Sequence, residues 1–207
     1  MKPILVTYVS MAGSTAEVAQ AIADELTARG HELAVRPMDE LDGLEAFGGA
    51  VIGGPMILGW HRRARSFVRQ NRAALAKIPW AVFVTAMSLT ATGSSQVDGV
   101  PITVDPGLPK APVDPGRLSH RERYATLSNY LRPILAASKP AKPHSIALFA
   151  GRMDYGRVPP WARLFAMLIV QAPAGDRRNW DAIRRWARDL GAVFGPNLSE
   201  KQAQVPS

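Results

Sequence analysis

The chain has 207 residues, of which 47% are hydrophobic, as is typical of one globular domain with a sizeable core. It contains no cysteine, which excludes disulfides, thiolate catalysis and metal clusters held by cysteine. The net charge of +8 indicates a basic surface and favours an anionic partner, but charge alone does not name that partner.

Nothing in the sequence predicts a membrane span or a secretory signal. No apolar run reaches the roughly 18–20 residues that a bilayer-spanning helix needs. Lys2 is followed directly by a strand and a turn, without the apolar region of a signal peptide. We therefore expect a cytoplasmic protein, and we leave open a peripheral contact with an anionic membrane at the inner face of the cell.

The first predicted element is a buried strand at residues 4–9, which is rich in β-branched and aromatic side chains. The turn that follows, residues 10–15, has three hydroxyl side chains and one glycine. Ser14 and Glu17 have the spacing of a capping box, which predicts a helix that begins near Thr15. Free N–H groups at a helix start favour a phosphate. The alternative is a well-capped first turn of any α/β protein.

Four further strand patterns alternate with amphipathic helical patterns. Gly30 is well placed to end the first helix, Ser119 and Glu122 repeat the capping-box spacing, and Asn179 is the expected cap of the last helix. The alternation predicts an α/β fold with three layers and a doubly wound sheet of five parallel strands. The later strands are expected at residues 31–37, 50–54, 79–87 and 145–151, and the later helices at residues 62–76, 119–135 and 179–194.

Two loops are expected to join the first turn at one edge of this sheet, because ligands of open α/β sheets bind beyond the carboxyl ends of the strands. The loop at residues 55–60 is apolar and suits a flat aromatic ring better than a sugar. Its alternative role is to pack on the following helix. The polar loop at residues 88–90 follows the fourth strand and is the natural third contact for such a ligand.

Four cations, Arg62, Arg65, Arg69 and Arg72, lie on one stripe of the helix predicted at residues 62–76. A solvated face is the simplest explanation of the stripe, and attraction to anionic lipid headgroups or to an anionic substrate is the sharper one. Nucleic acid is not predicted as a partner, because no binding motif or interleaved aromatic residue accompanies the stripe.

Three segments depart from the alternating pattern. Five prolines predict an unstructured loop insertion at residues 94–118, of the kind that forms lids or mobile segments. Residues 157–172 form an apolar helical element that fits a core helix, a dimer contact or a membrane-interface anchor. The tail at residues 196–207 is expected to be disordered, which leaves residues 1–195 as one domain.

The first turn carries a resemblance to a known family. Residues 7–15, Thr-Tyr-Val-Ser-Met-Ala-Gly-Ser-Thr, resemble the FMN-phosphate loop of the flavodoxin family, and they lack the lysine or the three glycines of other phosphate loops. The resemblance implies a sheet of order 2-1-3-4-5 that binds FMN at these three loops. The residues implied to bind FMN are Ser10, Met11, Ala12, Gly13, Ser14, Thr15, Pro55, Met56, Ile57, Leu58, Gly59, Trp60, Ser88, Leu89, Thr90 and Gly151.

A closer resemblance comes from the C-terminal third, where Phe149-Ala150-Gly151 precedes a tyrosine, an apolar helix, Gly175-Asp176 and the stretch at residues 180–187. This order is similar to the menaquinone-dependent protoporphyrinogen IX dehydrogenase branch, which residues 59–61 and 88–90 also match. The resemblance implies an FMN-dependent oxidoreductase of haem biosynthesis, with protoporphyrinogen IX as substrate and a quinone as electron acceptor.

Two other functions stay open. One is a flavodoxin-fold reductase that acts on another quinone or on NAD(P)H, and the other is a non-catalytic module that binds a partner or a membrane through its basic face. No catalytic residue is named: His61 lies near the expected ring edge, but a lone loop histidine is more often uninvolved. No metal site is predicted, and a homo-oligomer is left open.

Overall fold

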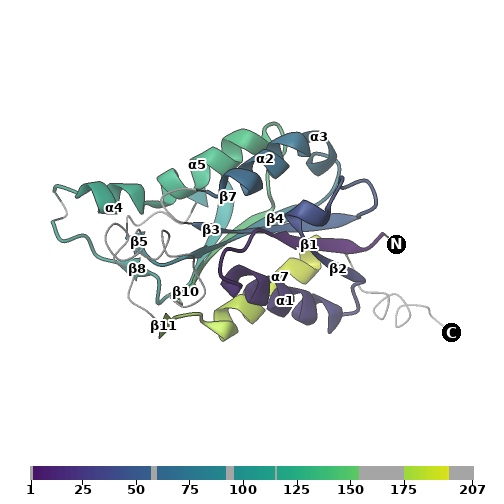
Figure 1. The fold of residues 1–207 in the computed structure, drawn as a ribbon, viewed down its shortest axis with the longest axis horizontal. Helices are drawn as coiled ribbons and strands as arrows, with labels where there is room; N and C mark the ends of the chain where they lie inside the picture. Colours follow the sequence, from purple (N-terminus) through teal and green to yellow (C-terminus); the bar gives the residue numbers. More distant parts are fainter. Residues whose placement is uncertain (1, 57–59, 92–95, 115, 154–174, 196–207) are drawn as a thin grey trace.

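The computed structural model describes residues 2–56, 60–91, 96–114, 116–153 and 175–195 (Figure 1). The apolar element expected at residues 157–172 and the tail at residues 196–207 lie outside this described part. Within it, no helix is both long enough and apolar enough to cross a membrane.

The five predicted strands lie next to one another in one sheet. Pairing is parallel throughout this group, in the order β2-β1-β3-β4-β9, which is the predicted order 2-1-3-4-5. The three central strands are buried over almost their whole length, as expected for a sheet covered on both faces. The bounds are β1 (Ile4–Tyr8), β2 (Leu33–Pro37), β3 (Gly49–Met56), β4 (Trp80–Ala86) and β9 (Ser145–Ala150).

The sheet has seven strands rather than five, because the proline-rich segment is partly structured. Asp98 and Gly99 have φ values of 54° and 75°, the conformation of a two-residue hairpin turn between β6 (Gln96–Val97) and β7 (Val100–Val104). β7 then pairs with β9 in parallel. Pro101 does not prevent this pairing, since the register with β9 begins at Ile102. The expected unstructured loop is therefore wrong for this part of the insertion.

Two further short pairings lie beyond the main sheet. β5 (Leu89–Thr90) pairs with β8 (Pro109–Lys110), and β10 (Arg152–Met153) pairs with β11 (Gly175–Asp176). These strands and the short helix α4 (His120–Tyr124) lie at the end of the molecule toward which the central strands run (Figure 1).

Helices cover the two faces of the sheet as separate layers (Figure 1). α1 (Ser14–Thr27) and α7 (Trp180–Val193) cover one face, and α2 (Arg62–Gln70), α3 (Arg72–Leu75) and α5 (Leu127–Ser138) cover the other. The helix expected at residues 62–76 is thus divided at Asn71. A short helix of the 3-10 type, η1 (Met38–Glu40), follows β2.

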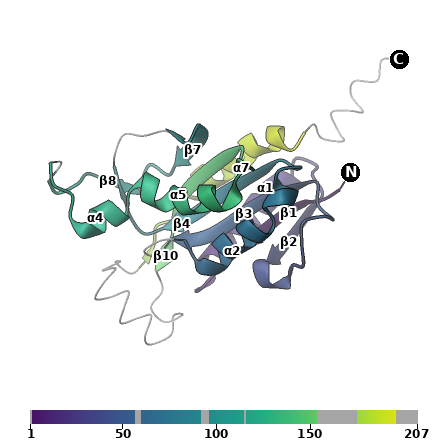
Figure 2. The ribbon, with the colours of Figure 1, turned by 90° about the horizontal axis from the view of Figure 1, so that it is seen from above.

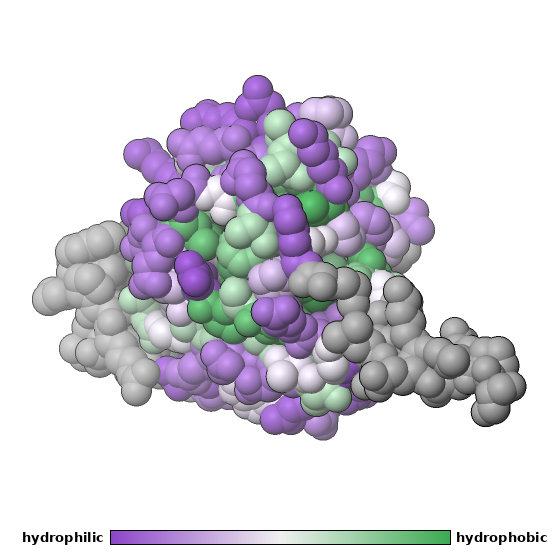
Figure 3. All heavy atoms as spheres, turned by 90° about the vertical axis from the view of Figure 1, so that its right-hand side faces the viewer, coloured by the Kyte–Doolittle hydropathy of each residue, from purple (hydrophilic) through white to green (hydrophobic). Residues whose placement is uncertain are grey.

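Each layer encloses its own hydrophobic cluster because side chains alternate along a strand. In β1, Leu5 packs with the α2 and α5 side and Val6 with the α1 and α7 side. The end of the molecule at which the strands begin is covered mainly by hydrophilic side chains, with smaller apolar areas between them (Figure 3). The two ends of the sheet therefore differ, and the loops that the sequence singles out lie at the opposite end.

The close packing of β3 on β4 gives a test of the fold. A Cβ added at Gly53 would lie 2.0 Å from Cζ of Phe83, whose ring is fully buried. Gly53→Ala is expected to lower the free energy of unfolding by about 1–3 kcal/mol through overpacking. The matched control is Gly191→Ala in α7, where the nearest atom is 3.4 Å away and the helix gains up to about 1 kcal/mol. Urea unfolding measures both, and equal midpoints for the two variants would contradict the packing.

Candidate functional site

The site is built where four parallel strands end. β1, β3, β4 and β9 are neighbours in the sheet, so their carboxyl ends meet at one edge, as predicted. Figure 2 shows this edge from above, with β10 and β8 near it and α2 and α5 in front of the sheet. The four strands end at Tyr8, Met56, Ala86 and Ala150, and the loops of interest follow these residues.

The loop after β1 leaves an open helix start. Gly13 has a φ of 85° and is the N-cap residue of α1, and no side chain caps the helix. Ser10 has its hydroxyl oxygen buried without a hydrogen-bond partner. A buried hydroxyl and uncapped N-terminal N–H groups are what an anion such as a phosphate would satisfy.

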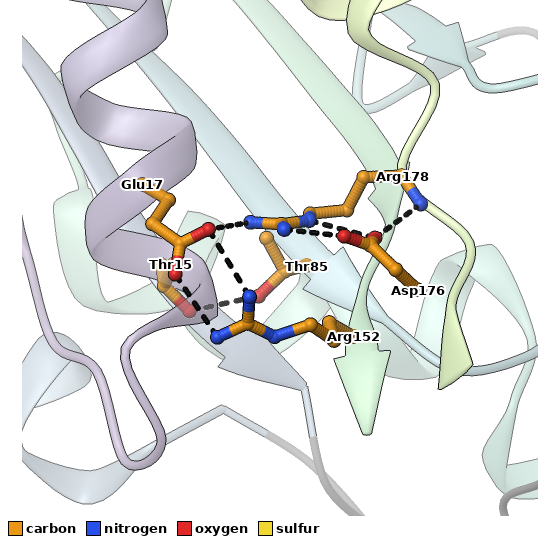
Figure 4. A network of polar contacts seen from close by, with 6 residues as sticks. All are labelled: Thr15, Glu17, Thr85, Arg152, Asp176 and Arg178. Carbon is orange, nitrogen blue, oxygen red and sulfur yellow. Dashed lines mark hydrogen bonds and ion pairs between the residues drawn. The ribbon is translucent and has the colours of Figure 1, made fainter. Parts of the chain in front are cut away.

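The predicted capping box between Ser14 and Glu17 is wrong. The helix begins at Ser14 itself, and the Glu17 side chain turns toward two arginines instead (Figure 4). A charge-assisted hydrogen bond to a guanidinium is stronger than one to a neutral N–H, which explains the choice. By contrast, the second capping box is confirmed, since Glu122 accepts from the Ser119 N–H and the Ser119 hydroxyl accepts from the Glu122 N–H.

A buried hydrogen bond ties the first turn of α1 to the sheet. The hydroxyl oxygens of Thr15 and Thr85 lie 2.9 Å apart, and both residues are almost fully buried (Figure 4). Thr85 belongs to β4, so this contact fixes the start of α1 relative to a strand 70 residues further along the chain. The N-terminus of α1 is therefore a rigid part of the site.

Two arginines surround Glu17 from the C-terminal part of the chain. Nη1 of Arg178 lies 2.7 Å from Glu17 Oε2, and Nη2 of Arg152 lies 3.0 Å from Glu17 Oε1. Arg178 also donates from Nε to Asp176 Oδ1 at 2.8 Å, and its guanidinium stacks 4.4 Å above the Trp180 ring. The side chain of Arg178 is 2% exposed, so this charge is held inside the protein by two carboxylates.

This network shifts the titration of its members. Hydrogen bonds from Arg178 hold the pKa of Glu17 and the pKa of Asp176 below their ordinary values, although partial burial acts the other way. The hydrogen bond that Arg178 donates to Asp176 in turn raises the pKa of Arg178. All three groups therefore stay charged at neutral pH, and the arrangement is a fixed electrostatic frame.

Arg152 retains donor capacity within this frame. Its Nε is buried and has no hydrogen-bond partner in the described part of the chain. Arg152 directly follows Gly151 at the carboxyl end of β9, so it extends from the strand edge toward the start of α1 (Figure 4). A buried guanidinium N–H without an acceptor is a natural contact for an added carboxylate or phosphate.

Of the apolar loop after β3, Ile57, Leu58 and Gly59 lie outside the described residues. Met56 and Trp60 form a bridge to each other and are both buried. The Trp60 ring packs against Gly54 and belongs to the core cluster that contains Ala64 of α2. This arrangement corresponds to the alternative of packing on the following helix, and contact of this loop with FMN stays a prediction.

The polar loop after β4 is largely used by the fold. The Thr90 hydroxyl donates to the Glu122 carbonyl at 2.7 Å, and the Ser88 carbonyl accepts from the Tyr130 hydroxyl at 2.9 Å. Leu89 and Thr90 are buried, whereas Ser88 is half-buried. Of the three residues, Ser88 is thus the one whose side chain the fold leaves nearest to solvent.

His61 is the N-cap residue of α2, and its Nδ1 accepts from the Arg63 N–H at 3.3 Å. Burial lowers the pKa of His61. A neutral capping role accounts for this side chain at neutral pH. Within the described residues, no group of three histidine, aspartate or glutamate side chains could hold a metal ion.

The sequence reasoning missed the charged frame of Glu17, Arg152, Asp176 and Arg178. Arg152 stands directly after the fifth predicted strand, at the edge where ligands bind, and this position could have signalled it. The pairing of Glu17 with Arg178 had no signal, because 161 positions separate them.

Fold and site together define a doubly wound α/β protein with an anion site at its first helix. The sequence matches the family described as "Flavodoxin domain" over residues 5–179, and the chain belongs to this family. It is a flavodoxin-type flavoprotein, and the family implies FMN as its cofactor. The unpartnered Ser10 hydroxyl and the uncapped start of α1 fit the phosphate of FMN.

Solved structures agree with this fold. A short-chain flavodoxin associated with a non-canonical PDU bacterial microcompartment has a TM-score of 0.51 and 11% identity, with 94% of this chain and 100% of that chain covered. A flavodoxin from Streptococcus pneumonia TIGR4 has a TM-score of 0.48 and 14% identity, with 91% and 97% covered.

A longer protein is also among the similar solved structures. Rubredoxin oxygen:oxidoreductase from Desulfovibrio gigas has a TM-score of 0.48 and 11% identity over 99% of this chain, and this chain spans 38% of that one. The search of curated proteins found no match.

Removal of Arg178 tests the charged frame. Arg178→Met is expected to lower the free energy of unfolding at pH 7 by about 1–3 kcal/mol, less than for a fully buried pair, because Glu17 and Asp176 are 40% and 41% exposed. Their lowered pKa values contribute stability above the carboxyl pKa of the unfolded chain, and this stability is lost as the pH falls through the folded pKa.

The difference in the free energy of unfolding between wild type and Arg178→Met should therefore become smaller as the pH falls. Urea unfolding at a series of pH values from neutral to acid measures it. The control is Arg184→Gln, an exposed arginine 4.0 Å from Asp181, which should change stability by less than about 0.5 kcal/mol at any pH. A gap that stays constant with pH would contradict the frame.

Proposed function

We propose that the chain is an FMN-dependent dehydrogenase that oxidises protoporphyrinogen IX and passes the electrons to a quinone. The chemistry that FMN supplies is the oxidation of a substrate and the reduction of an acceptor. Ser10, Gly13 and the start of α1 would hold its phosphate, and the loops after β3 and β4 would line its ring.

The observation that supports FMN binding is the buried Ser10 hydroxyl beside the uncapped start of α1. A chain that kept this loop only as a structural turn would be expected to satisfy both groups internally. The open donors support a bound anion, and membership of the flavodoxin family supports FMN as that anion.

The substrate part rests on the resemblance of the C-terminal third and on Arg152. Protoporphyrinogen IX carries carboxylates, and Arg152 offers a buried N–H without an acceptor at the same edge of the sheet. Glu17 and Arg178 would keep this guanidinium in place while its Nε contacts the substrate. The protein would act in the cytoplasm, with its acceptor in the adjoining membrane.

FMN binding tests the cofactor part. The purified protein should show a flavin absorption band or acquire one on titration with FMN. Ser10→Ala should weaken FMN binding roughly tenfold, because it removes one hydrogen bond to a charged group. Ser66→Ala, on α2, is the control and should leave the affinity unchanged. A colourless protein that takes up no FMN would favour the non-catalytic module.

The substrate is tested by anaerobic reduction of the bound flavin. Protoporphyrinogen IX should bleach the flavin band, and a quinone should restore it. Bleaching by NAD(P)H but not by the porphyrinogen would replace this proposal with a nicotinamide-dependent reductase. If the protein binds FMN but neither donor reduces it, FMN binding would be supported and the proposed substrate would be contradicted.

Arg152→Gln separates substrate recognition from cofactor binding. Loss of a charge-assisted hydrogen bond to a carboxylate should raise KM for the porphyrinogen roughly tenfold or more. Reoxidation by a quinone, which has no carboxylate, should keep its rate. The control is Arg188→Gln. Arg188 belongs to α7 and lies 3.7 Å from Glu25, which is on α1 together with Glu17. Equal losses in both half-reactions would contradict the assigned role of Arg152.

A further inference from the structure

The charges of this chain are divided between the two helical layers. α2, α3 and α5 carry six arginines and no aspartate or glutamate. α1 and α7 carry five acidic residues and three arginines. The basic character of the chain is therefore concentrated on one side of the sheet, and a partner attracted by charge would approach that side.

The arginines of this layer face solvent. Arg62, Arg65, Arg69 and Arg72 are all exposed, and no ion pair is formed by them among the described residues. Arg63, beside them, has a long contact of 3.9 Å with Asp39. Unpaired exposed arginines keep their full attraction for an external anion.

Two exposed apolar side chains extend the same layer beyond the sheet. Val113 is 94% exposed and Tyr124 is 58% exposed, and Lys110, Arg117 and Arg123 are exposed near them in the chain. In Figure 1, α4 continues the row of α2 and α5 past the ends of the strands, and Figure 2 shows the three helices toward the viewer. We name Val113, Tyr124 and these three cations the tip.

One carboxylate ties the backbone at Val113 to the start of α4. Glu122 accepts from the Val113 N–H at 2.7 Å and from the Ser119 N–H at 2.8 Å. Its backbone carbonyl accepts from the Thr90 hydroxyl, which fixes α4 to β5. Hydrogen bonds from Ser119 and Val113 lower the pKa of Glu122. The apolar side chains are thus presented by an ordered support and do not project from a free loop.

We propose that the tip and the arginine face of α2 and α3 together bind an anionic lipid bilayer. Arginine and lysine beside a membrane bind its anionic headgroups, and a tyrosine is suited to the headgroup level, where its ring is apolar and its hydroxyl is wet. Val113 and Tyr124 supply the apolar contact that holds such a protein at the interface.

Other partners fit this surface less well. Two exposed apolar side chains are too few for the core of a stable protein interface, which buries about 800 Å² on each partner. Single-stranded nucleic acid needs aromatic rings between the cations, and among the described residues the exposed large apolar side chains are Met11, Val113 and Tyr124. The arginines of α2 and α3 have no such ring beside them.

Lipid binding by this surface does not require redox activity, whereas delivery of electrons to a quinone does. The tip lies at the same end of the molecule as the carboxyl edge of the sheet (Figure 1). Docking through the tip would bring the FMN loops near the bilayer, where a lipophilic quinone is dissolved. This consequence, and only this, rests on the proposed function.

The absence of cysteine allows a direct test. Val113→Cys creates a unique thiol that can carry an environment-sensitive fluorophore. With vesicles of phosphatidylglycerol and phosphatidylcholine, the emission should shift to the blue and strengthen, as the dye enters the interface. The control is Arg184→Cys on α7, which should show no shift. A Val113 dye that does not respond, or two dyes that respond equally, would overturn the proposal.

Vesicle sedimentation tests the charged part of the surface. Arg65→Gln with Arg69→Gln should weaken binding to phosphatidylglycerol vesicles roughly 30-fold, because each arginine near an anionic surface contributes about 1 kcal/mol to binding. The matched control, Arg184→Gln with Arg185→Gln on α7, removes the same charge from the other layer and should leave binding within about threefold. Equal losses would show attraction by net charge alone and would overturn the assigned face.

Two further measurements complete the test. Phosphatidylcholine vesicles should bind far more weakly than vesicles with phosphatidylglycerol, and a nucleic-acid oligonucleotide should not displace the protein from them. Displacement by the oligonucleotide would make nucleic acid the partner and overturn the lipid assignment. The flavin spectrum is recorded in the same samples, so a failure to bind vesicles is distinguished from a failure to bind FMN.

Discussion

The ion pair between Glu17 and Arg178 connects the first helix of the chain to its C-terminal part, and the geometry of the site depends on it. Arg178 is buried against Trp180, and it bonds at the same time to Asp176. The start of α1 is thereby held against the segment that follows β11. A phosphate site made of backbone N–H groups works only if the helix that supplies them is held in place.

The same frame explains why the site has little net charge of its own. Two arginines face two carboxylates, so their charges largely cancel before any ligand arrives. A phosphate at the start of α1 would meet backbone N–H groups and hydroxyls, as in the hydroxyl-rich turn predicted from the sequence. Among the described residues, the Nε of Arg152 is a buried N–H of this frame without an acceptor, and a second anion would find a donor there.

The order of the five central strands could be predicted from the sequence because each strand is a buried run between turn residues, and the first turn resembles a known loop. The two added strands could not, because β6 has only two residues and β7 lies in the proline-rich segment. Their signal is the Asp98-Gly99 pair, a strong hairpin motif that proline-based reasoning overlooked. Trp60 is a second case. The apolar composition of its loop favours contact with a flavin ring, whereas its packing on Gly54 and α2 depends on tertiary contacts that the sequence does not show.

The prolines near the tip also explain why its acidic residues bond to the backbone and form no ion pair with its cations among the described residues. Proline removes backbone donors and interrupts strand pairing, so the remaining N–H groups need other acceptors. Asp105 accepts from Gly107 and Ala150, Asp114 accepts from Gly116, and Glu122 accepts from Val113 and Ser119. Because the oxygens of these carboxylates bond to backbone N–H groups, none of them forms an ion pair with Lys110, Arg117 or Arg123 among the described residues. A segment that is poor in regular structure is thus ordered by its own acids, while Lys110, Arg117 and Arg123 face solvent.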